Sequence, residues 1–465
     1  MSFFLTKALA ALDDGGDRPL FHHENGVTTY HQARARLRRL HGGLGQEKPG
    51  HDKLGHAKTV AVDLRNRPET LLVQLAGLLR GATVLMVPAS APRRDRLAAA
   101  EGATIVTDRP DDWPGGDVRT LDDLDGEPVP LDPPETVHLL FPTGGTTGAP
   151  KLIRHSGIYD GMACIFTPDP AGPGRMLLVA PMTHMTGNAA VLGALLRRDT
   201  VVLQDGFDAG AVLAAIQEHR IDTLSLTPPR LAAVLDHPAR ESTDLGSVRS
   251  LSLGAAPLPP HRLAQALDVF GPVVGQGYGL TEAPMIAGIS AAELIDHPER
   301  LGSVGRIVPG MEARITEDGE VEVRGLSMMD GYLGGPPVGA GWLRTGDLGR
   351  FDDDGYLYLL DRADDVVVVG EHGTKVPSTV VEHALEAHPA VRSAAVFGLT
   401  TEDGQVLHAV VVTSSEVTED ALKAHAREAF DQEHYVPASV DFADALPLTE
   451  VGKVDKRALM TSRTR

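Results

Sequence analysis

MLLVAPMTHMTGNAAVLGALLRRDTVVLQDGFDAGAVLAAIQEHRIDTLSL, residues 176–226, alternates short apolar runs with longer amphipathic runs. The short runs are rich in aliphatic and β-branched residues, which favour buried strands, and the longer runs have helical spacing. Consecutive parallel strands need a crossover of this length, so the stretch predicts an α/β architecture with largely parallel sheets. The expected strands and helices are, in order, 176–179, 189–196, 200–203, 209–219 and 223–226.

The same alternation appears earlier and the character of the chain changes later. Residues 59–62, 69–79 and 83–87 repeat the strand, helix, strand order. After about Gly302 the apolar runs become short and Gly/Asp turns join them, which predicts antiparallel hairpins or a small barrel over 304–315, 319–324, 342–351 and 356–360. From Val366 the alternation resumes on a smaller scale. We therefore expect a large N-terminal domain, 1–361, and a small α+β C-terminal domain, 362–465.

Bulk properties narrow the class of protein. The chain has 465 residues, 42% of them hydrophobic, which predicts two or three domains. Its formal net charge of −20 opposes binding to nucleic acid.

Cys164 is the only cysteine, so no internal disulfide forms and a reducing cytoplasm is the expected compartment. No apolar run approaches the roughly 20 residues that cross a bilayer, and residues 3–12 are expected to form an amphipathic helix.

The loop Phe141-Pro142-Thr143-Gly144-Gly145-Thr146-Thr147-Gly148-Ala149-Pro150-Lys151 is the first candidate for chemistry. Glycines let backbone N–H groups approach a phosphate closely, and the threonine hydroxyls add donors. The kinase and GTPase loop requires Gly-Lys-Ser/Thr in direct succession, and Ala149 and Pro150 break that order here. From its residues alone, the loop is as compatible with an ordinary surface turn as with an anion cradle.

Two further stretches carry residues suited to a nucleotide. In Gln276-Gly277-Tyr278-Gly279-Leu280-Thr281-Glu282, the Tyr ring can lie against a flat base, the Thr can bond a phosphate, and the Glu can hold Mg²⁺. In Trp342-Leu343-Arg344-Thr345-Gly346-Asp347-Leu348-Gly349, an Asp beside glycines suits the vicinal hydroxyls of a ribose. The ordinary alternatives are a strand end with a packed Tyr278 and a turn formed by Asp347.

In this order and spacing, the stretches resemble the adenylate-forming (ANL) superfamily of acyl-CoA synthetases, peptide-synthetase adenylation domains and luciferases. The Gly/Thr loop departs from the family pattern at Gly144, where Ser is usual. The resemblance implies large αβ sandwich subdomains with a small β-barrel, and a mobile C-terminal lid. It also implies that ATP and AMP contact Thr143, Gly144, Gly145, Thr146, Thr147, Gly148, Lys151, Gly254, Ala255, Ala256, Gly277, Tyr278, Gly279, Asp347 and Arg362.

The resemblance extends to the groups that act on the substrate. Lys453, within Leu446-Pro447-Leu448-Thr449-Glu450-Val451-Gly452-Lys453, falls on the family's catalytic lysine. Its ammonium would lower the barrier to the attack of a carboxylate on the α-phosphate. Thr281 and Glu282 complete the implied catalytic set, with Glu282 on Mg²⁺. By the same resemblance, His184, Gly254 and Gly279 border the acyl pocket, Asp364 is the hinge, and Gly373 admits the pantetheine arm of the acceptor.

The sequence therefore predicts a two-step ligase that forms acyl-AMP and passes the acyl group to a thiol. CoA is the first choice of acceptor, with the phosphopantetheine of an acyl or peptidyl carrier protein, or an amine, as alternatives. The segment after residues 181–187 lacks the Asp that anchors an amino group in peptide synthetases, so an aromatic or medium apolar acid is favoured over an amino acid. The rival classes are a catalytically silent nucleotide-binding relative and an ATP hydrolase or kinase that forms ADP.

Overall fold

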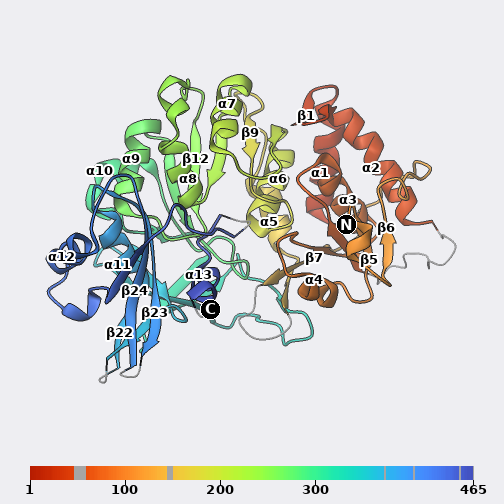
Figure 1. Cartoon of the computed structure of the whole chain (residues 1–465). Helices are drawn as coiled ribbons and strands as arrows, with labels where there is room; N and C mark the ends of the chain where they lie inside the picture. The colour runs from red at the N-terminus through yellow and green to blue at the C-terminus, as the bar shows by residue number, and fades with distance from the viewer. Residues whose placement is uncertain (47–58, 144–149, 371–372, 402–403, 450–451, 464–465) are drawn as a thin grey trace.

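The computed structural model describes residues 1–46, 59–143, 150–370, 373–401, 404–449 and 452–463. Two large mixed sheets, a small antiparallel sheet and a C-terminal lid make up the molecule (Figure 1). The lid lies beside the large N-terminal part, next to the small antiparallel sheet.

The first sheet has nine strands in the order β15-β14-β13-β12-β11-β9-β10-β1-β2. All pairings from β1 to β13 along this order are parallel, and the edge pairings are antiparallel. Its strands are β1 Pro19–His23, β2 Gly26–Thr29, β9 Arg175–Leu178, β10 Thr200–Leu203, β11 Thr223–Leu226, β12 Ser250–Gly254, β13 Val274–Tyr278, β14 Ala287–Ile289 and β15 Arg306–Ile307. The helices between them are α6 Met185–Arg197, α7 Ala209–His219, α8 Pro228–Leu235, α9 Pro260–Phe270 and α10 Ala291–Asp296.

The second sheet has seven strands in the order β18-β8-β7-β4-β3-β5-β6, with a parallel centre and an antiparallel edge at β7, β8 and β18. Its strands are β3 Thr59–Asp63, β4 Thr83–Met86, β5 Thr104–Thr107, β6 Asp117–Arg119, β7 His138–Thr143, β8 Lys151–His155 and β18 Gly331–Tyr332. The associated helices are α1 Phe3–Gly15, α2 Tyr30–Leu44, α3 Pro68–Leu79, α4 Arg93–Ala99 and α5 Ile158–Ile165.

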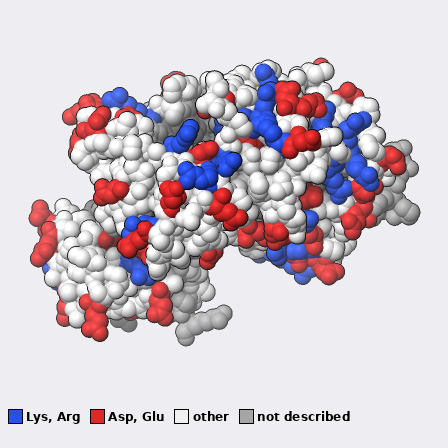
Figure 2. Space-filling model, turned by 90° about the horizontal axis from the view of Figure 1, so that it is seen from above, with Lys and Arg blue, Asp and Glu red and all other residues white. Residues whose placement is uncertain are grey.

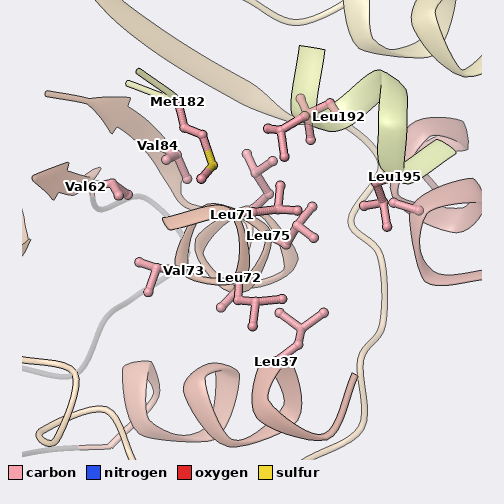
Figure 3. Packing of buried hydrophobic residues seen from close by; sticks show 14 of the residues in the cluster. Leu37, Val62, Leu71, Leu72, Val73, Leu75, Val84, Met182, Leu192 and Leu195 are labelled. Atoms are coloured by element: carbon pink, nitrogen blue, oxygen red, sulfur yellow. The ribbon is translucent and has the colours of Figure 1, made fainter. Parts of the chain in front are cut away.

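Helix α3 lies at the centre of the main core. Leu71, Leu72 and Leu75 of this helix pack between Leu37 of α2 and Leu192 of α6, and Val84 of β4 closes another side (Figure 3). Almost every residue of α3 is buried, which is the pattern expected for a helix that is apolar all round. This helix therefore contributes to one hydrophobic core shared by elements of the two large sheets.

The region after Gly302 forms an open antiparallel sheet in the order β16-β17-β19-β20. Its strands are β16 Met311–Ile315, β17 Glu320–Gly325, β19 Leu343–Phe351 and β20 Leu357–Arg362. The prediction of one β run over 304–315 was wrong in detail, because the run divides into β15 and β16. Gly310 takes φ +86° between them, a backbone angle that ends the strand. The antiparallel hairpins themselves are confirmed.

The lid has its own sheet, in which β22, β21, β24 and β23 follow one another and β25 pairs with β24. Its elements are β21 Val367–Val369, β22 Thr374–Val376, α11 Ser378–Glu386, β23 Val391–Thr401, β24 Gly404–Thr413, α12 Glu419–Ala429, β25 Ser439–Phe442 and α13 Lys456–Arg463. A separate cluster of buried residues, including Val381 and Val411, fills it. The predicted boundary at 361/362 falls at the end of β20 and stays a prediction.

The expected α/β class is confirmed, and most elements of residues 176–226 lie within a residue of the expected bounds. Helix α6 is the exception, because it begins at Met185 and not at residue 189. Its first turn includes Asn188, a polar residue that breaks the apolar pattern but is fully buried. Asn188 exchanges hydrogen bonds of 2.7 and 3.2 Å with Gln74 of α3, so tertiary pairing compensates for its burial.

Charges on the surface are mixed. Figure 2 shows acidic and basic side chains interspersed over the face seen from above. Along α2, Arg36 and Arg39 share Asp125, and Arg34 bonds Asp13. No helix within the described residues is both long enough and apolar enough to cross a membrane.

Glu386, at the end of α11, has an unusual environment. Burial raises the pKa of its carboxyl to about 8, and the nearby Glu382 adds to the effect. The N–H of Ala394, which donates to Glu386 Oε1 at 2.9 Å, opposes the shift. Between the ordinary value of 4.5 and about 8, the folded protein thus holds a proton that the unfolded chain releases. Stability contributed by this group falls as pH rises through that window.

We expect Glu386→Gln to flatten the decline in the free energy of unfolding between pH 4.5 and about 8, because Gln keeps the acceptor for Ala394 without ionising. Urea unfolding across this range measures the slope. Glu428→Gln, an exposed change on α12, is the matched control and should keep the wild-type slope. Equal slopes for wild type and Glu386→Gln would contradict the assignment.

Candidate active site

A buried carboxylate joins three strands at the proposed ribose site. Asp347 of β19 lies opposite Arg362 of β20 in the antiparallel ladder. The Tyr278 hydroxyl, at the end of β13, donates to Asp347 Oδ2 at 2.5 Å, and Arg362 Nη1 donates to Oδ1 at 2.8 Å. Burial raises the pKa of Tyr278, and the adjacent carboxylate raises it further, so the phenol remains a donor. Three expected nucleotide contacts are therefore one hydrogen-bonded unit.

The turns after β12 and β13 bring two backbones close together. Gly254 lies beside Gly277 in parallel register, and a Cβ on Gly254 would lie 2.7 Å from the carbonyl oxygen of Gly277. A Cβ on Gly279 would lie 2.2 Å from the carbonyl oxygen of Pro284. Ala255 has φ +68°, a left-handed conformation that costs a non-glycine residue about 1 kcal/mol. Such outliers gather at binding sites, which supports this loop as part of one.

Thr281 and Glu282 are held by residues from the second sheet. His155 Nε2 of β8 hydrogen-bonds the carbonyl oxygen of Thr281 at 2.7 Å. The Tyr332 hydroxyl of β18 donates to Glu282 Oε1 at 3.1 Å, and burial raises the pKa of that phenol to about 12. Lys151 Nζ lies 5.0 Å from the centre of the Tyr332 ring. The predicted phosphate loop and the predicted metal ligand are thus connected through Tyr332.

His155 and Tyr332 are site residues that the sequence did not indicate. They lie 126 and 50 residues from their respective partners Thr281 and Glu282, and neither belongs to the motifs singled out in the sequence. The available signals were the position of His155 at the end of the strand that begins with Lys151, and the glycines of Gly331-Tyr332-Leu333-Gly334-Gly335 around Tyr332.

The Gly/Thr loop connects β7 with β8. The two strands pair as far as Thr143 and Lys151, and Thr143 Oγ1 donates to the carbonyl oxygen of Lys151 at 3.4 Å. The predicted phosphate contacts of Gly144, Gly145, Thr146, Thr147 and Gly148 lie outside the described residues. The loop is anchored at the edge of the sheet that also carries Tyr332 on β18.

Lys453 reaches the same region from the lid. Its loop is closed by two backbone hydrogen bonds of 2.8 Å, from Thr449 N to the Lys453 carbonyl and from Gly452 N to the Thr449 carbonyl. Burial lowers the pKa of Lys453, the Asp347 carboxylate opposes that shift, and Arg362 adds to it. The Lys453 side chain is exposed to solvent, and its ammonium interacts electrostatically with both Asp347 and Arg362. The structure thus brings Lys453 to the Tyr278–Asp347–Arg362 unit.

The remaining predicted residues lie in four separate segments. His184 precedes α6 and is half-buried, and Ala256 follows Ala255 in its turn. Asp364 lies in the turn after β20. Gly373 has φ +66° at the turn between β21 and β22, and this end of the lid points away from the large domain in Figure 1. In this lid pose, Lys453 interacts electrostatically with Asp347 and Arg362, while the turn between β21 and β22 points away from the large domain (Figure 1).

The donor set suits a hydrated Mg²⁺. No group of three or more His, Cys, Asp or Glu side chains in the described part of the chain is arranged to hold a metal. Mg²⁺ in nucleotide enzymes commonly uses one or two carboxylates, phosphate oxygens and water. Tyr332 fixes Glu282 through Oε1, and among the described residues no hydrogen bond is made to Oε2. Glu282 therefore fits a single protein ligand to a metal that arrives with ATP.

Comparison with known proteins places this geometry in a family. Residues 10–333 match the model of AMP-binding enzymes, and residues 380–453 match the model of their C-terminal domain. The chain belongs to the AMP-binding enzyme family. This membership confirms the family and fold class expected from the motifs. The division between the two matched regions lies around the small antiparallel sheet and the start of the lid.

This AMP-binding enzyme is similar to named ligases and synthetases. It is 37% identical to the medium/long-chain-fatty-acid–CoA ligase FadD8 of Mycobacterium tuberculosis, over 70% of this chain and 61% of that ligase. Its structure is similar to the amide bond synthetase McbA of Marinactinospora thermotolerans, with 29% identity, TM-score 0.82, and 99% and 100% of the two chains covered. It is also similar to the O-succinylbenzoate coenzyme A synthetase of Bacillus subtilis in complex with ATP and magnesium, with 26% identity, TM-score 0.82, and 98% and 99% covered.

We expect Asp347→Asn to weaken the binding of Mg²⁺-ATP by about tenfold to a hundredfold. The amide loses the charge that makes hydrogen bonds to ribose hydroxyls strong, and it cannot accept from both Tyr278 and Arg362 as the carboxylate does. Titration calorimetry measures the affinity. Asp353→Asn, in the exposed turn of the same hairpin, should bind like wild type. An unchanged affinity in Asp347→Asn would remove this residue from the nucleotide site.

Proposed function

We propose that this enzyme activates a carboxylic acid with Mg²⁺-ATP and transfers the acyl group to a thiol, with CoA as the first choice. In the first step a carboxylate oxygen bonds to the α-phosphorus of ATP, the bond to the β-phosphate oxygen breaks, and pyrophosphate leaves. In the second step a thiolate attacks the acyl carbon and AMP leaves. The observation that supports this proposal is the approach of Lys453, carried by the lid, to the Asp347–Arg362 pair.

The residues have distinct roles in the first step. Asp347, oriented by Tyr278 and Arg362, accepts hydrogen bonds from the ribose, and the Tyr278 ring lies against the base. Thr281 donates to the α-phosphate, and Glu282 holds Mg²⁺, which neutralises phosphate charge. The carboxylate and the α-phosphate are both anionic, so the Lys453 ammonium between them stabilises the charge that develops in the transition state. Burial lowers the pKa of Lys453, and the Asp347 carboxylate opposes that shift, which favours the charged ammonium.

The second step requires a different lid pose. Gly373 lies away from the nucleotide site while Lys453 is docked there, so one pose cannot serve both steps. A rotation about Asp364 would withdraw Lys453 and bring Gly373 toward the acyl-AMP, where a glycine leaves room for a pantetheine arm. Changes of domain pose commonly divide consecutive steps in this way.

The acceptor has one specific alternative. A CoA acceptor agrees with the FadD8 and O-succinylbenzoate ligases to which this chain is similar. An amine acceptor is favoured by the similarity to an amide bond synthetase over 99% of the chain. A carrier-protein thiol would use the same chemistry as CoA. For the acid, we propose an aromatic or medium apolar carboxylic acid, because the chain lacks the amino-group anchor of peptide synthetases.

Product analysis by mass spectrometry tests the proposal. The purified protein is incubated with Mg²⁺-ATP, pooled aromatic, fatty and amino acids, and either CoA or a pool of amines. AMP, pyrophosphate and an acyl-adenylate are the expected products, and the adenylate mass identifies the acid. An acyl-CoA or an amide then identifies the acceptor. Formation of ADP, or ATP binding without turnover of any pooled acid, would contradict the proposal.

We expect Lys453→Ala to slow acyl-AMP formation by a factor of roughly 10² to 10³, because it removes the cation that offsets transition-state charge. Transfer from preformed acyl-AMP should remain at the wild-type rate. The two half-reactions are measured separately, by pyrophosphate release and by acceptor acylation. Lys7→Ala, at an exposed lysine of α1, is the control and should leave both rates unchanged. Equal losses in both half-reactions would overturn the catalytic role.

A further inference from the structure

Helix α8 contacts the lid at both of its ends. Thr227 is the residue before the helix and Asp236 is the residue after it. The Thr227 hydroxyl donates to the carbonyl oxygen of Gly452, directly before Lys453, at 3.1 Å. The Asp236 carboxylate lies 3.7 Å from Nε of Arg392 in the lid. Eight helical residues span about 12 Å, so these contacts hold the lid at two separated points.

The Thr227 side chain bonds the lid and does not cap its own helix. A threonine in this position usually accepts a hydrogen bond from an N–H of its own first turn. Here Pro228 and Pro229 occupy the first two helical positions, and the Thr227 side chain makes no capping bond. Its hydroxyl is thus available to the lid and bonds the loop that carries the catalytic lysine.

The backbone of Gly452 fits closely against this end of the helix. Gly452 is buried and has φ +80°. A Cβ at this position would lie 2.7 Å from Thr227 Oγ1 and 2.8 Å from Arg230 Nε. Only a residue without a side chain can therefore approach α8 in this way, and the approach fixes the loop within one residue of Lys453.

The contact at Asp236 has an electrostatic explanation. A carboxylate at the C-terminal end of a helix faces the negative end of the helix dipole and is disfavoured there. Arg262 of α9 compensates through bonds of 2.8 and 3.0 Å to the two oxygens, and Arg392 adds charge from the lid. Arg262 also donates to the carbonyl oxygen of Arg392 at 3.4 Å. Asp236 and Arg262 together therefore contact both the side chain and the backbone of Arg392 in the lid.

We infer that Thr227 and Asp236 are positioning residues that clasp the lid in the pose for acyl-AMP formation. Thr227 fixes where Lys453 enters the site, and Asp236 with Arg392 fixes the rotation of the lid about that point. This inference rests on the proposed function for its catalytic meaning. Neither residue takes part in the chemistry, so both act through Lys453.

Hydrogen exchange of the ligand-free, full-length protein tests the clasp without knowledge of the acid. In Thr227→Val, which keeps the shape and removes the hydroxyl, amides of residues 446–455 should exchange about twofold to tenfold faster than in wild type. Thr227→Ser keeps the hydroxyl and should restore the wild-type rate. Arg392→Gln should raise the exchange rate of the same amides by less than about fivefold. Arg427→Gln, which removes a salt bridge within the lid, is the control and should leave their exchange rate unchanged.

Amides of β24 report on the stability of the lid and should be unchanged in every variant. Equal exchange of residues 446–455 in wild type and Thr227→Val would overturn the inference, as would acceleration shared with β24.

With an accepted acid, Thr227→Val should slow acyl-AMP formation and spare transfer from preformed acyl-AMP. Equal slowing of both half-reactions would also overturn it. If exchange changes as expected but wild type forms no acyl-AMP, the clasp stands and the proposed function fails.

Discussion

The buried carboxylate of Asp347 is the interaction on which the arrangement of the site depends. A carboxylate removed from water requires compensating donors or cations, and each donor here comes from a different part of the chain. Tyr278 belongs to the large parallel sheet, Arg362 to the last strand before the lid, and Lys453 to the lid itself. The bonds to this one carboxylate therefore tie strands of two sheets together, and Lys453 lies within electrostatic range of the same carboxylate, near the place where ATP is proposed to bind.

The lid contacts at α8 and α9 are hydrogen bonds and ion pairs, which suits the change of position proposed for the lid. The Asp361 carboxylate, three residues before the proposed hinge, accepts from the hydroxyls of Ser378 and Thr379 at the start of α11, at 2.9 and 3.0 Å. A rotation about Asp364 has to separate these groups as well as the contacts at α8. Polar groups released in this way regain water, so the cost of undocking is smaller than that of exposing an apolar interface.

The second sheet holds the segment of Thr281 and Glu282, the proposed phosphate and metal ligands, through two hydrogen bonds. His155 and Tyr332 bind one carbonyl and one carboxylate oxygen, and both lie near the edge of the sheet that leads into the Gly/Thr loop. The proposed phosphate and metal ligands are thus mounted on rigid strands, whereas Lys453 arrives on a separate body. This division agrees with a two-step reaction in which the nucleotide stays in place while the lid exchanges poses.

The sequence by itself determined the α/β class, most element positions within residues 176–226, and the family, because hydrophobic periodicity and short glycine-rich motifs are local properties of the chain. It did not determine the start of α6, where the buried Asn188 is explained only by Gln74, 114 residues away. Nor did it indicate His155, Tyr332 or Thr227, whose partners lie far along the chain, 225 residues away for Thr227 and Gly452. Tertiary structure alone decided these contacts and the pose of the lid, because a hydrogen bond between distant residues depends on how separate elements pack and leaves no periodic signal in either segment.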